Sequence, residues 1–236
     1  MIVSKEFFVG FNMIDKNMAI KDSALLVLFG DIAGIHSNMV GDGFSKSYDR
    51  WVLLGYNVVV LNRPVHGQTI TVKTWSVSYR GVQAVREFEV TSESGELLAY
   101  ATSTWTLYNI QTKRLVKITD EKMEAYKSLP NKTNFGTETE KLIDPSNTGE
   151  EFNFVVDWRY IDLNNHMNNS YYLDVSSHIL GDDFAYNAFS VLYKKEIVEN
   201  TKIVVRKIKE DASMVVTIKD QENGMLYSII KYYNKK

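Results

Sequence analysis

Apolar residues recur along the chain at two spacings, and the order of these spacings repeats. Segments 22–38 and 168–180 carry apolar side chains three and four residues apart, which is typical of a helix packed on one face. Other apolar runs are rich in Val, Ile, Thr and aromatic residues, as strands are. These runs are 51–62, 68–79, 82–91 and 97–110, then 189–198, 201–209, 213–220 and 225–233. The pattern predicts a helix packed on an antiparallel sheet, formed twice.

The two halves also align directly. FFVGFNMIDKNMA at residues 7–19 matches FVVDWRYIDLNNH at residues 154–166 without a gap, at an offset of 147 residues. Further along, ESGELLAY from Glu93 resembles ENGMLYSI from Glu222, and each predicts a Gly-containing turn between paired strands. A repeat of this length indicates a duplicated domain. We therefore expect domains at 1–130 and 150–236, joined by a polar linker at 131–149.

Composition narrows the chemistry and the partners. The 236 residues are 44% hydrophobic and 24% charged, as in ordinary soluble globular proteins. Cysteine is absent, which excludes disulfides, thiolate metal sites and a cysteine nucleophile. The formal charge of -2 gives no basis for nucleic-acid binding. No apolar run approaches the roughly 18 residues of a membrane span, and no secretory pattern is recognised. We expect a cytoplasmic protein with neither nucleic-acid nor membrane partners.

The motif DLNNHMNN, residues 162–169, concentrates polar chemistry just before the second predicted helix. Asp162, Asn164 and His166 alternate, so an extended chain would project their side chains from one face. Imidazole exchanges protons near neutral pH, and a neighbouring carboxylate can orient its ring. Asn168 and Asn169 are candidate N-caps, followed by helix N–H groups that could face an oxyanion. The same residue types also suit an ordinary turn and cap, and spacing alone leaves both interpretations open.

The first half helps to separate these two interpretations. In the same frame it keeps Asp15 and Asn17 but has Ala19 where the second half has His166. The duplicated unit therefore has the turn residues without the imidazole. This difference predicts a single active site, in the second half.

Three stretches of this sequence resemble the acyl-ACP thioesterase family. DLNNHMNNSYYLD fits the family pattern Asp-x-Asn-x-His-x-Asn-Asn-x-x-Tyr, and residues 74–118 resemble its Trp-rich strand region. YKKEI at 193–197 is similar to the family's Tyr-Arg-Arg-Glu-Cys: it keeps the glutamate as Glu196 and has Ile197 in place of the cysteine. The resemblance covers nearly the whole chain. It implies an α+β fold, the tandem or double hotdog, in which each half is a long helix packed against an antiparallel sheet.

The resemblance also implies an activity, a partner and a site. The activity is hydrolysis of fatty acyl-acyl carrier protein (acyl-ACP) with release of free fatty acid in fatty acid biosynthesis, with acyl-ACP as the partner and no cofactor. The four dispersed histidines show no metal-ligand spacing, so no metal is expected. The implied catalytic residues are Asp162, Asn164, His166 and Glu196. Candidate substrate-binding residues are Asn168 and a helical stripe of Leu25, Leu28, Phe29 and Ile32, although such a stripe is also typical of plain core.

Several alternatives stay open at this stage. The carrier could be coenzyme A, and a hotdog hydratase or dehydratase also acts on acyl thioesters. A non-catalytic acyl-binding module would use the motif only as a cap. Attack by water and direct attack by a carboxylate through an anhydride are both consistent with the residues. Acyl chain length, saturation and oligomeric state, including a homodimer, are not determined by the sequence.

Overall fold

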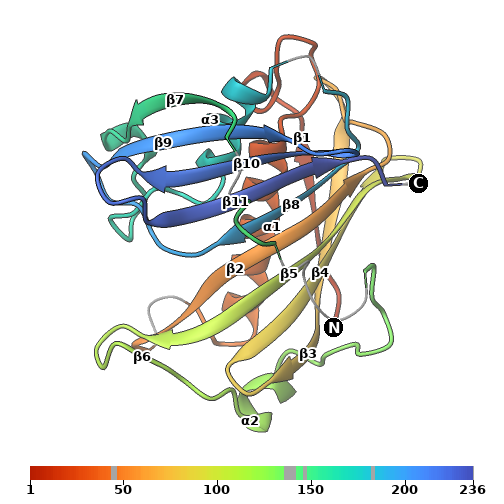
Figure 1. The fold of residues 1–236 in the computed structure, drawn as a ribbon. Coiled ribbons are helices and arrows are strands. Elements are labelled where there is room, and N and C mark those ends of the chain that lie inside the picture. Colours follow the sequence, from red (N-terminus) through yellow and green to blue (C-terminus); the bar gives the residue numbers. More distant parts are fainter. Residues whose placement is uncertain (44–46, 136–141, 146–147, 182–183, 236) are drawn as a thin grey trace. The chain divides into compact units, whose positions relative to one another are not determined.

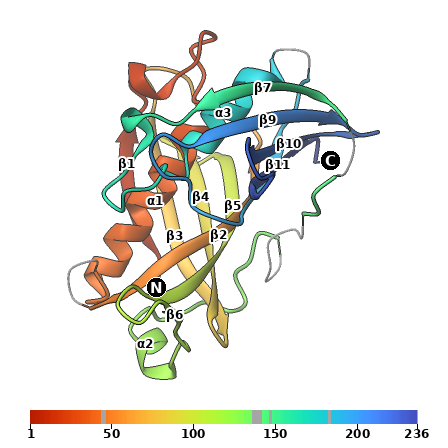
Figure 2. The same cartoon turned by 60° about the vertical axis from the view of Figure 1, so that its left-hand side comes forward.

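The computed structural model describes residues 1–43, 47–135, 142–145, 148–181 and 184–235, and these form two compact units, 1–139 and 140–236 (Figure 1). The predicted linker, 131–149, lies partly outside the described residues. Each unit contains its own set of antiparallel strands, and each has one main helix (Figure 2). Among the described helices, none is both long and apolar enough to cross a membrane.

The N-terminal unit is an antiparallel sheet with the spatial order β2-β5-β4-β3-β1, and its main helix is α1. The strands are β1 (Val3–Phe8), β2 (Asp49–Val60), β3 (Thr69–Arg80), β4 (Gln83–Ser92) and β5 (Leu97–Asn109). Helix α1 (Asp22–Met39) packs against β1 and β3. Three short elements complete the unit: the 3-10 turn η1 (Phe11–Met13), the strand β6 (Arg114–Leu115), which pairs with β5, and the helix α2 (Asp120–Glu124).

The C-terminal unit has the same topology, with the spatial order β8-β11-β10-β9-β7. Its strands are β7 (Glu150–Val155), β8 (Ala188–Tyr193), β9 (Lys202–Lys209), β10 (Ser213–Asp220) and β11 (Leu226–Tyr233). Helix α3 (Tyr171–Leu180) packs against this sheet, and the 3-10 turn η2 (Trp158–Tyr160) precedes it. The predicted double hotdog is confirmed, because the strands of the two units have the same order.

Equivalent structural elements of the two units also lie 147 residues apart in the sequence. Strands β1 and β7 are separated by 147 residues, as are the turns η1 and η2. An isolated β-bridge joins Ile14 to Ile20 in the first unit and Ile161 to Met167 in the second. The Gly-containing hairpins predicted between β4 and β5 and between β10 and β11 also form, with Gly95 and Gly224 at φ 85° and 73°. Glycine adopts this left-handed backbone at no steric cost, because it has no Cβ.

The apolar stripe of α1 is buried against the sheet. Leu25, Phe29 and Ile32 are inaccessible to solvent, and the Phe29 ring stacks on Phe88 of β4 with centroids 4.6 Å apart. In the C-terminal unit an aromatic contact joins Tyr172 of α3 to Tyr193 of β8, whose rings meet edge to face at 5.3 Å. Burial of these large side chains is the main force that holds each helix on its sheet.

The short elements β6, α2, η1 and η2 were not predicted, and the main elements differ from the prediction at three places. Strands β1 and β7 were not predicted, because most of their residues are exposed and few apolar positions mark them. Helix α3 begins at Tyr171, three residues later than expected. The run predicted as a strand over 189–198 ends at Tyr193, because the Lys194 N–H turns to donate to the carbonyl of Tyr227 at 2.8 Å. Glu196 therefore lies in a loop rather than on a strand.

Candidate active site

The motif before α3 folds as a tight turn, from Asp162 to His166. The Asp162 N–H donates to the His166 carbonyl at 2.8 Å, and Asn165 adopts a left-handed backbone at φ 61°. The Asp162 carboxylate accepts the backbone N–H of Asn164 at 2.8 Å, with the Asn164 amide 3.5 Å from its other oxygen. The predicted extended conformation is therefore wrong, because the left-handed residue reverses the chain. Asp162 and Asn164 nevertheless stay in contact.

A second loop, which follows β8, lies against this turn and contributes Glu196. The Met167 N–H donates to the Ile197 carbonyl at 2.7 Å, and this bond places the preceding residues of the two segments side by side. Nε2 of His166 is 3.9 Å from Oε1 of Glu196. The His166 side chain is 37% exposed and that of Glu196 is 61% exposed. Such an exposed pair adds little to stability, but both groups remain accessible to a substrate.

Two buried tyrosines, Tyr172 and Tyr193, contact the backbone of the turn and of the loop. The Tyr172 hydroxyl lies 3.5 Å from the Lys195 carbonyl, and the Tyr193 hydroxyl donates to the Asn169 carbonyl at 2.8 Å. Burial raises the pKa of Tyr172, and the negative charges of Glu196 and Asp162 raise it further. Tyr172 is therefore a neutral support that lies within electrostatic reach of both carboxylates.

The N-cap position of α3 is Ser170 rather than Asn168 or Asn169, the two candidates expected, and Asn168 stabilises the turn just before the helix. Its side-chain oxygen accepts the N–H of Ser170 at 2.9 Å and the Ser170 hydroxyl at 2.8 Å. The Tyr171 N–H donates to the Asn168 carbonyl at 3.0 Å. Two of the N–H groups considered for an oxyanion are therefore already hydrogen-bonded within the protein. A role for Asn168 in substrate binding stays a prediction.

The N-terminal unit builds the same turn without an imidazole. The Asp15 carboxylate accepts the Asn17 N–H at 2.8 Å, and the Asp15 N–H donates to the Ala19 carbonyl at 2.8 Å. Met18 takes the left-handed conformation, at φ 64°. Because each of these residues lies 147 positions before its counterpart, the Asp side chain stabilises the same turn in both units. The imidazole is not needed for this backbone.

The loop that carries Glu196 also has a counterpart in the N-terminal unit. There the Ile20 N–H donates to the Pro64 carbonyl at 2.8 Å, which is equivalent to the bond from Met167 to Ile197. Arg63 consequently occupies the position of Glu196. Its guanidinium donates to the Ile20 carbonyl at 2.9 Å and to Asp22 at 2.7 Å. The two units therefore share the scaffold and differ at the imidazole and at the glutamate.

The predicted substrate-binding stripe on α1 lies in the core of the N-terminal unit. Its residues are buried, and they do not line the cavity found on the neighbouring face of the helix. The stripe consists of Leu25, Leu28, Phe29 and Ile32. Contact between these residues and an acyl chain stays a prediction.

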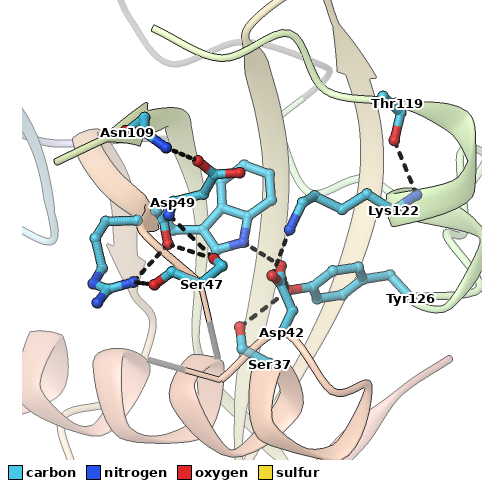
Figure 3. Close-up of polar contacts among 10 residues, drawn as sticks. Ser37, Asp42, Ser47, Asp49, Asn109, Thr119, Lys122 and Tyr126 are labelled. Atoms are coloured by element: carbon cyan, nitrogen blue, oxygen red, sulfur yellow. Dashed lines mark hydrogen bonds and ion pairs between the residues drawn. The ribbon is translucent and has the colours of Figure 1, made fainter. Parts of the chain in front are cut away.

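The cavity of the N-terminal unit has a volume of about 230 Å³ and a polar wall. The Asp42 carboxylate accepts three hydrogen bonds, from Lys122 at 2.5 Å, Trp51 at 2.7 Å and Tyr126 at 2.9 Å. Figure 3 shows the Lys122 and Tyr126 side chains converging on Asp42. The Ser37 hydroxyl lies 3.1 Å from that of Tyr126. The negative charge of Asp42 is therefore balanced by its own donors.

Sequence reasoning missed a second polar group in this wall, Arg86. It is only 8% exposed, and its Nη1 donates to Nδ1 of His36 at 3.0 Å. Burial, with the charge of Arg86 adding to it, lowers the pKa of His36 to about 3, so the ring stays neutral. Because Nδ1 accepts, the proton is on Nε2, which is buried without a partner. The sequence signal that could have found Arg86 is its place between Ala84 and Phe88 in an alternating strand pattern, which puts the arginine on a buried face.

The remaining histidines make aromatic contacts. The His66 ring stacks on Phe11 with centroids 4.1 Å apart, and the His178 ring meets Phe152 edge to face at 5.0 Å. Within the described part of the chain, no group of three potential metal-ligating His, Asp or Glu side chains occurs.

Solved structures share the paired hotdog units and define the class of fold. An acyl-ACP thioesterase from Bacteroides thetaiotaomicron matches 98% of this chain and 97% of its own, with a TM-score of 0.86 at 20% identity. The 12:0-ACP thioesterase from Umbellularia californica matches 98% of this chain and 96% of its own, with a TM-score of 0.82 at 21% identity. These likenesses show a double hotdog fold.

Family models identify the group within this class. The acyl-ACP thioesterase N-terminal domain matches residues 2–126, and the acyl-ACP thioesterase C-terminal domain matches residues 143–232. The chain belongs to the acyl-ACP thioesterase family. It is 29% identical over 150 residues to a chloroplastic acyl-[acyl-carrier-protein] hydrolase of Cuphea viscosissima. This match covers 58% of the chain and 36% of the relative's length.

Proposed function

We propose that this protein hydrolyses the thioester between a fatty acyl chain and acyl carrier protein. The observation that carries the proposal is the contact between His166 and Glu196 across the two site loops, 3.9 Å apart and open to solvent. The N-terminal unit has an alanine and an arginine at these positions, so neither group is required by the fold. The proposed active-site residues are Asp162, Asn164, His166 and Glu196.

The chemistry requires a base and some help for the oxyanion. Thiols have a pKa of about 8.5, so a thiolate is a good leaving group. A strong general acid is therefore not needed. His166 takes a proton from a water molecule, which attacks the thioester carbonyl, while Glu196 stabilises the imidazolium that forms. The C–S bond then breaks, and the thiolate recovers the proton from His166. The Asn164 amide is positioned by Asp162 and orients the water or the carbonyl.

A second route uses a carboxylate as the nucleophile. Asp162 or Glu196 would attack the carbonyl directly and form an anhydride that water then cleaves. The Asp162 carboxylate already accepts the Asn164 N–H, whereas the more exposed Glu196 is free to approach a substrate. Glu196 is therefore the stronger candidate for this route.

The carrier, the pathway and the location are further parts of the proposal. Curated relatives from Cuphea viscosissima and Gossypium hirsutum are named for acyl carrier protein substrates, which supports this carrier over coenzyme A. In each case the match spans 36% of the relative's length. A place in fatty acid biosynthesis, a cytoplasmic location and a homodimer stay predictions.

The test is a product analysis with a panel of acyl-ACP substrates. A thiol reagent measures release of the carrier, and chromatography identifies the free fatty acid. We expect equal amounts of both products, and a loss of turnover in His166→Ala and Glu196→Gln. Hydration of an enoyl substrate without thiol release would instead assign a hydratase. Faster turnover of acyl-coenzyme A than of every acyl-ACP would replace the proposed carrier.

A further inference from the structure

The tyrosine that ends the motif before and into α3, Tyr172, has no role in the reaction proposed above. Its ring is buried in the first turn of α3, and its hydroxyl contacts the loop that follows β8. The hydroxyl lies 3.5 Å from the Lys195 carbonyl oxygen, and it accepts the N–H of Ile197. Lys195 and Ile197 are the two neighbours of Glu196 in the chain. One hydroxyl therefore contacts both of the peptide groups that flank the Glu196 carboxylate.

A second buried hydroxyl, that of Tyr193, fixes the start of the same loop. Tyr193 is the last residue of β8, and its hydroxyl donates to the Asn169 carbonyl at 2.8 Å. Asn169 comes three residues after His166, so this bond joins the strand that leads to Glu196 to the segment that carries the imidazole. The two tyrosine rings meet edge to face at 5.3 Å, so each ring limits the movement of the other.

The N-terminal unit forms the same scaffold without these hydroxyls. Leu25 lies 147 residues before Tyr172 and is also buried. Strand β2 ends at Val60, three residues before the counterpart of Glu196, just as β8 ends at Tyr193. Burying a hydroxyl is costly unless it is hydrogen-bonded, so an apolar side chain would pack here at least as well. The fold therefore does not account for the two hydroxyls.

The side chains of His166 and Glu196 do not fix their own separation. They are 3.9 Å apart and partly exposed, so the attraction between them is weak. The backbone hydrogen bond from Met167 to the Ile197 carbonyl fixes the loop after Glu196. The Tyr172 hydroxyl contacts the peptide groups on both sides and so limits rotation of the backbone at Glu196. Burial raises the pKa of Tyr172, so its hydroxyl stays protonated at neutral pH.

We propose that Tyr172 and Tyr193 are positioning residues, which hold the Glu196 carboxylate against the imidazole of His166. The inference rests on the proposed function, in which Glu196 stabilises the imidazolium that forms on His166. Without a hydroxyl the loop is free to move, and displacement of a catalytic group by about 1 Å can lower turnover by about 10²-fold. Both hydroxyls are bonded to the backbone, so their loss should lower kcat and leave KM unchanged.

The experiment measures kcat and KM of Tyr172→Phe and Tyr193→Phe with an acyl-ACP substrate. Each substitution removes one hydroxyl and keeps the ring. We expect kcat to fall about tenfold or more, with KM within about twofold of the wild type. Tyr232→Phe is the matched control and should keep the wild-type kcat, because its buried hydroxyl contacts Ser176 of α3 instead of a site loop. A kcat within about twofold of the wild type in the folded variants overturns the proposal.

A double-mutant cycle with Glu196→Gln separates positioning from a general destabilisation of the unit. Single-turnover reactions with excess enzyme measure the slow variants. If the hydroxyl acts through Glu196, Tyr172→Phe should lower turnover by less than about twofold in the Glu196→Gln background. Equal proportional losses in both backgrounds would overturn the proposal. If Tyr172→Phe does not fold, Tyr193→Phe takes its place in the cycle.

Hydrogen exchange of the Ile197 amide tests the contact without any substrate. Tyr172→Phe should exchange this proton about tenfold or more faster than the wild type, because the amide loses its acceptor. Tyr232→Phe should leave the exchange rate unchanged. Equal rates in Tyr172→Phe and the wild type would overturn the positioning role. A wild type that releases no fatty acid would instead refute the proposed function, so the two failures are distinguishable.

Discussion

Glu87 provides a direct test of how burial controls charge in the N-terminal unit. Its side chain is inaccessible to solvent on β4, and the Thr102 hydroxyl donates to its two oxygens at 2.7 and 2.8 Å. Burial raises the pKa of Glu87 from an ordinary 4.5 to about 7, although hydrogen bonds from Thr102 and Asn134 oppose the rise. Arg86 is adjacent in sequence, but successive strand side chains point to opposite faces, so it cannot neutralise Glu87.

The sign and size of the effect follow from proton linkage. The folded chain binds the Glu87 proton more tightly than the unfolded chain, so the associated stability is complete below pH 4.5 and is lost as the pH rises through about 7. Each tenfold change in proton affinity corresponds to about 1.4 kcal/mol, so the loss amounts to about 3 kcal/mol as an upper estimate. Glu87→Gln keeps the shape and cannot ionise, so it should not lose this stability.

Urea unfolding of the wild type and Glu87→Gln at several pH values between 4.5 and 8.5 measures the effect. We expect the free energy of unfolding of Glu87→Gln to improve relative to wild type by up to about 3 kcal/mol across this range. Glu93→Gln, in the exposed turn between β4 and β5, is the matched control and should follow the wild type. If the difference in the free energy of unfolding between Glu87→Gln and the wild type does not change with pH over this range, the argument from burial is wrong.

Three further predictions concern the turns and the helix. His166→Ala should lower kcat by about 10²- to 10⁴-fold. The free energy of unfolding, measured in urea, should change by less than about 0.5 kcal/mol, because Ala19 occupies the equivalent position of the N-terminal turn, and a large loss of stability would contradict this. Asp15→Ala and Asp162→Ala should each destabilise the protein by about 1 kcal/mol, and steady-state assays should find turnover reduced only in the second. Gly34→Ala should raise the free energy of unfolding by up to about 1 kcal/mol, because the new methyl group meets open space; a decrease would show that the space is not open.

Periodicity and internal repetition were sufficient to predict most of the fold. Long strands such as β3 and β5 are buried on at least one face, so their apolar pattern is strong, and they start and end within two residues of the predicted limits. Strands β1 and β7 escaped prediction because they are largely exposed, and their pairing depends on neighbours far along the chain. Local pattern cannot show such pairing.

The residues of the candidate site were named from the sequence, and their catalytic role stays a prediction, but their arrangement was not predicted. Asp162, Asn164 and His166 are close in sequence, so any compact turn keeps them together. Sequence spacing suggested an extended chain, because the left-handed conformation of Asn165 gives no signal in an apolar pattern. Glu196 was expected on a strand and lies in a loop. The backbone hydrogen bond from Met167 to Ile197 places this loop beside His166. That tertiary contact has no local sequence signal.

The turn in the N-terminal unit has a consequence for redesign of the protein. Its backbone already has the conformation that presents an imidazole in the other unit, so Ala19→His needs no remodelling of the chain. The opposing position is harder to change, since Arg63 ties the loop to Ile20 and Asp22. Arg63→Glu would remove that tie and bring two carboxylates together. Installing a second reactive centre therefore requires three coordinated changes, at 19, 22 and 63, and a double variant at 19 and 63 would loosen the loop it depends on.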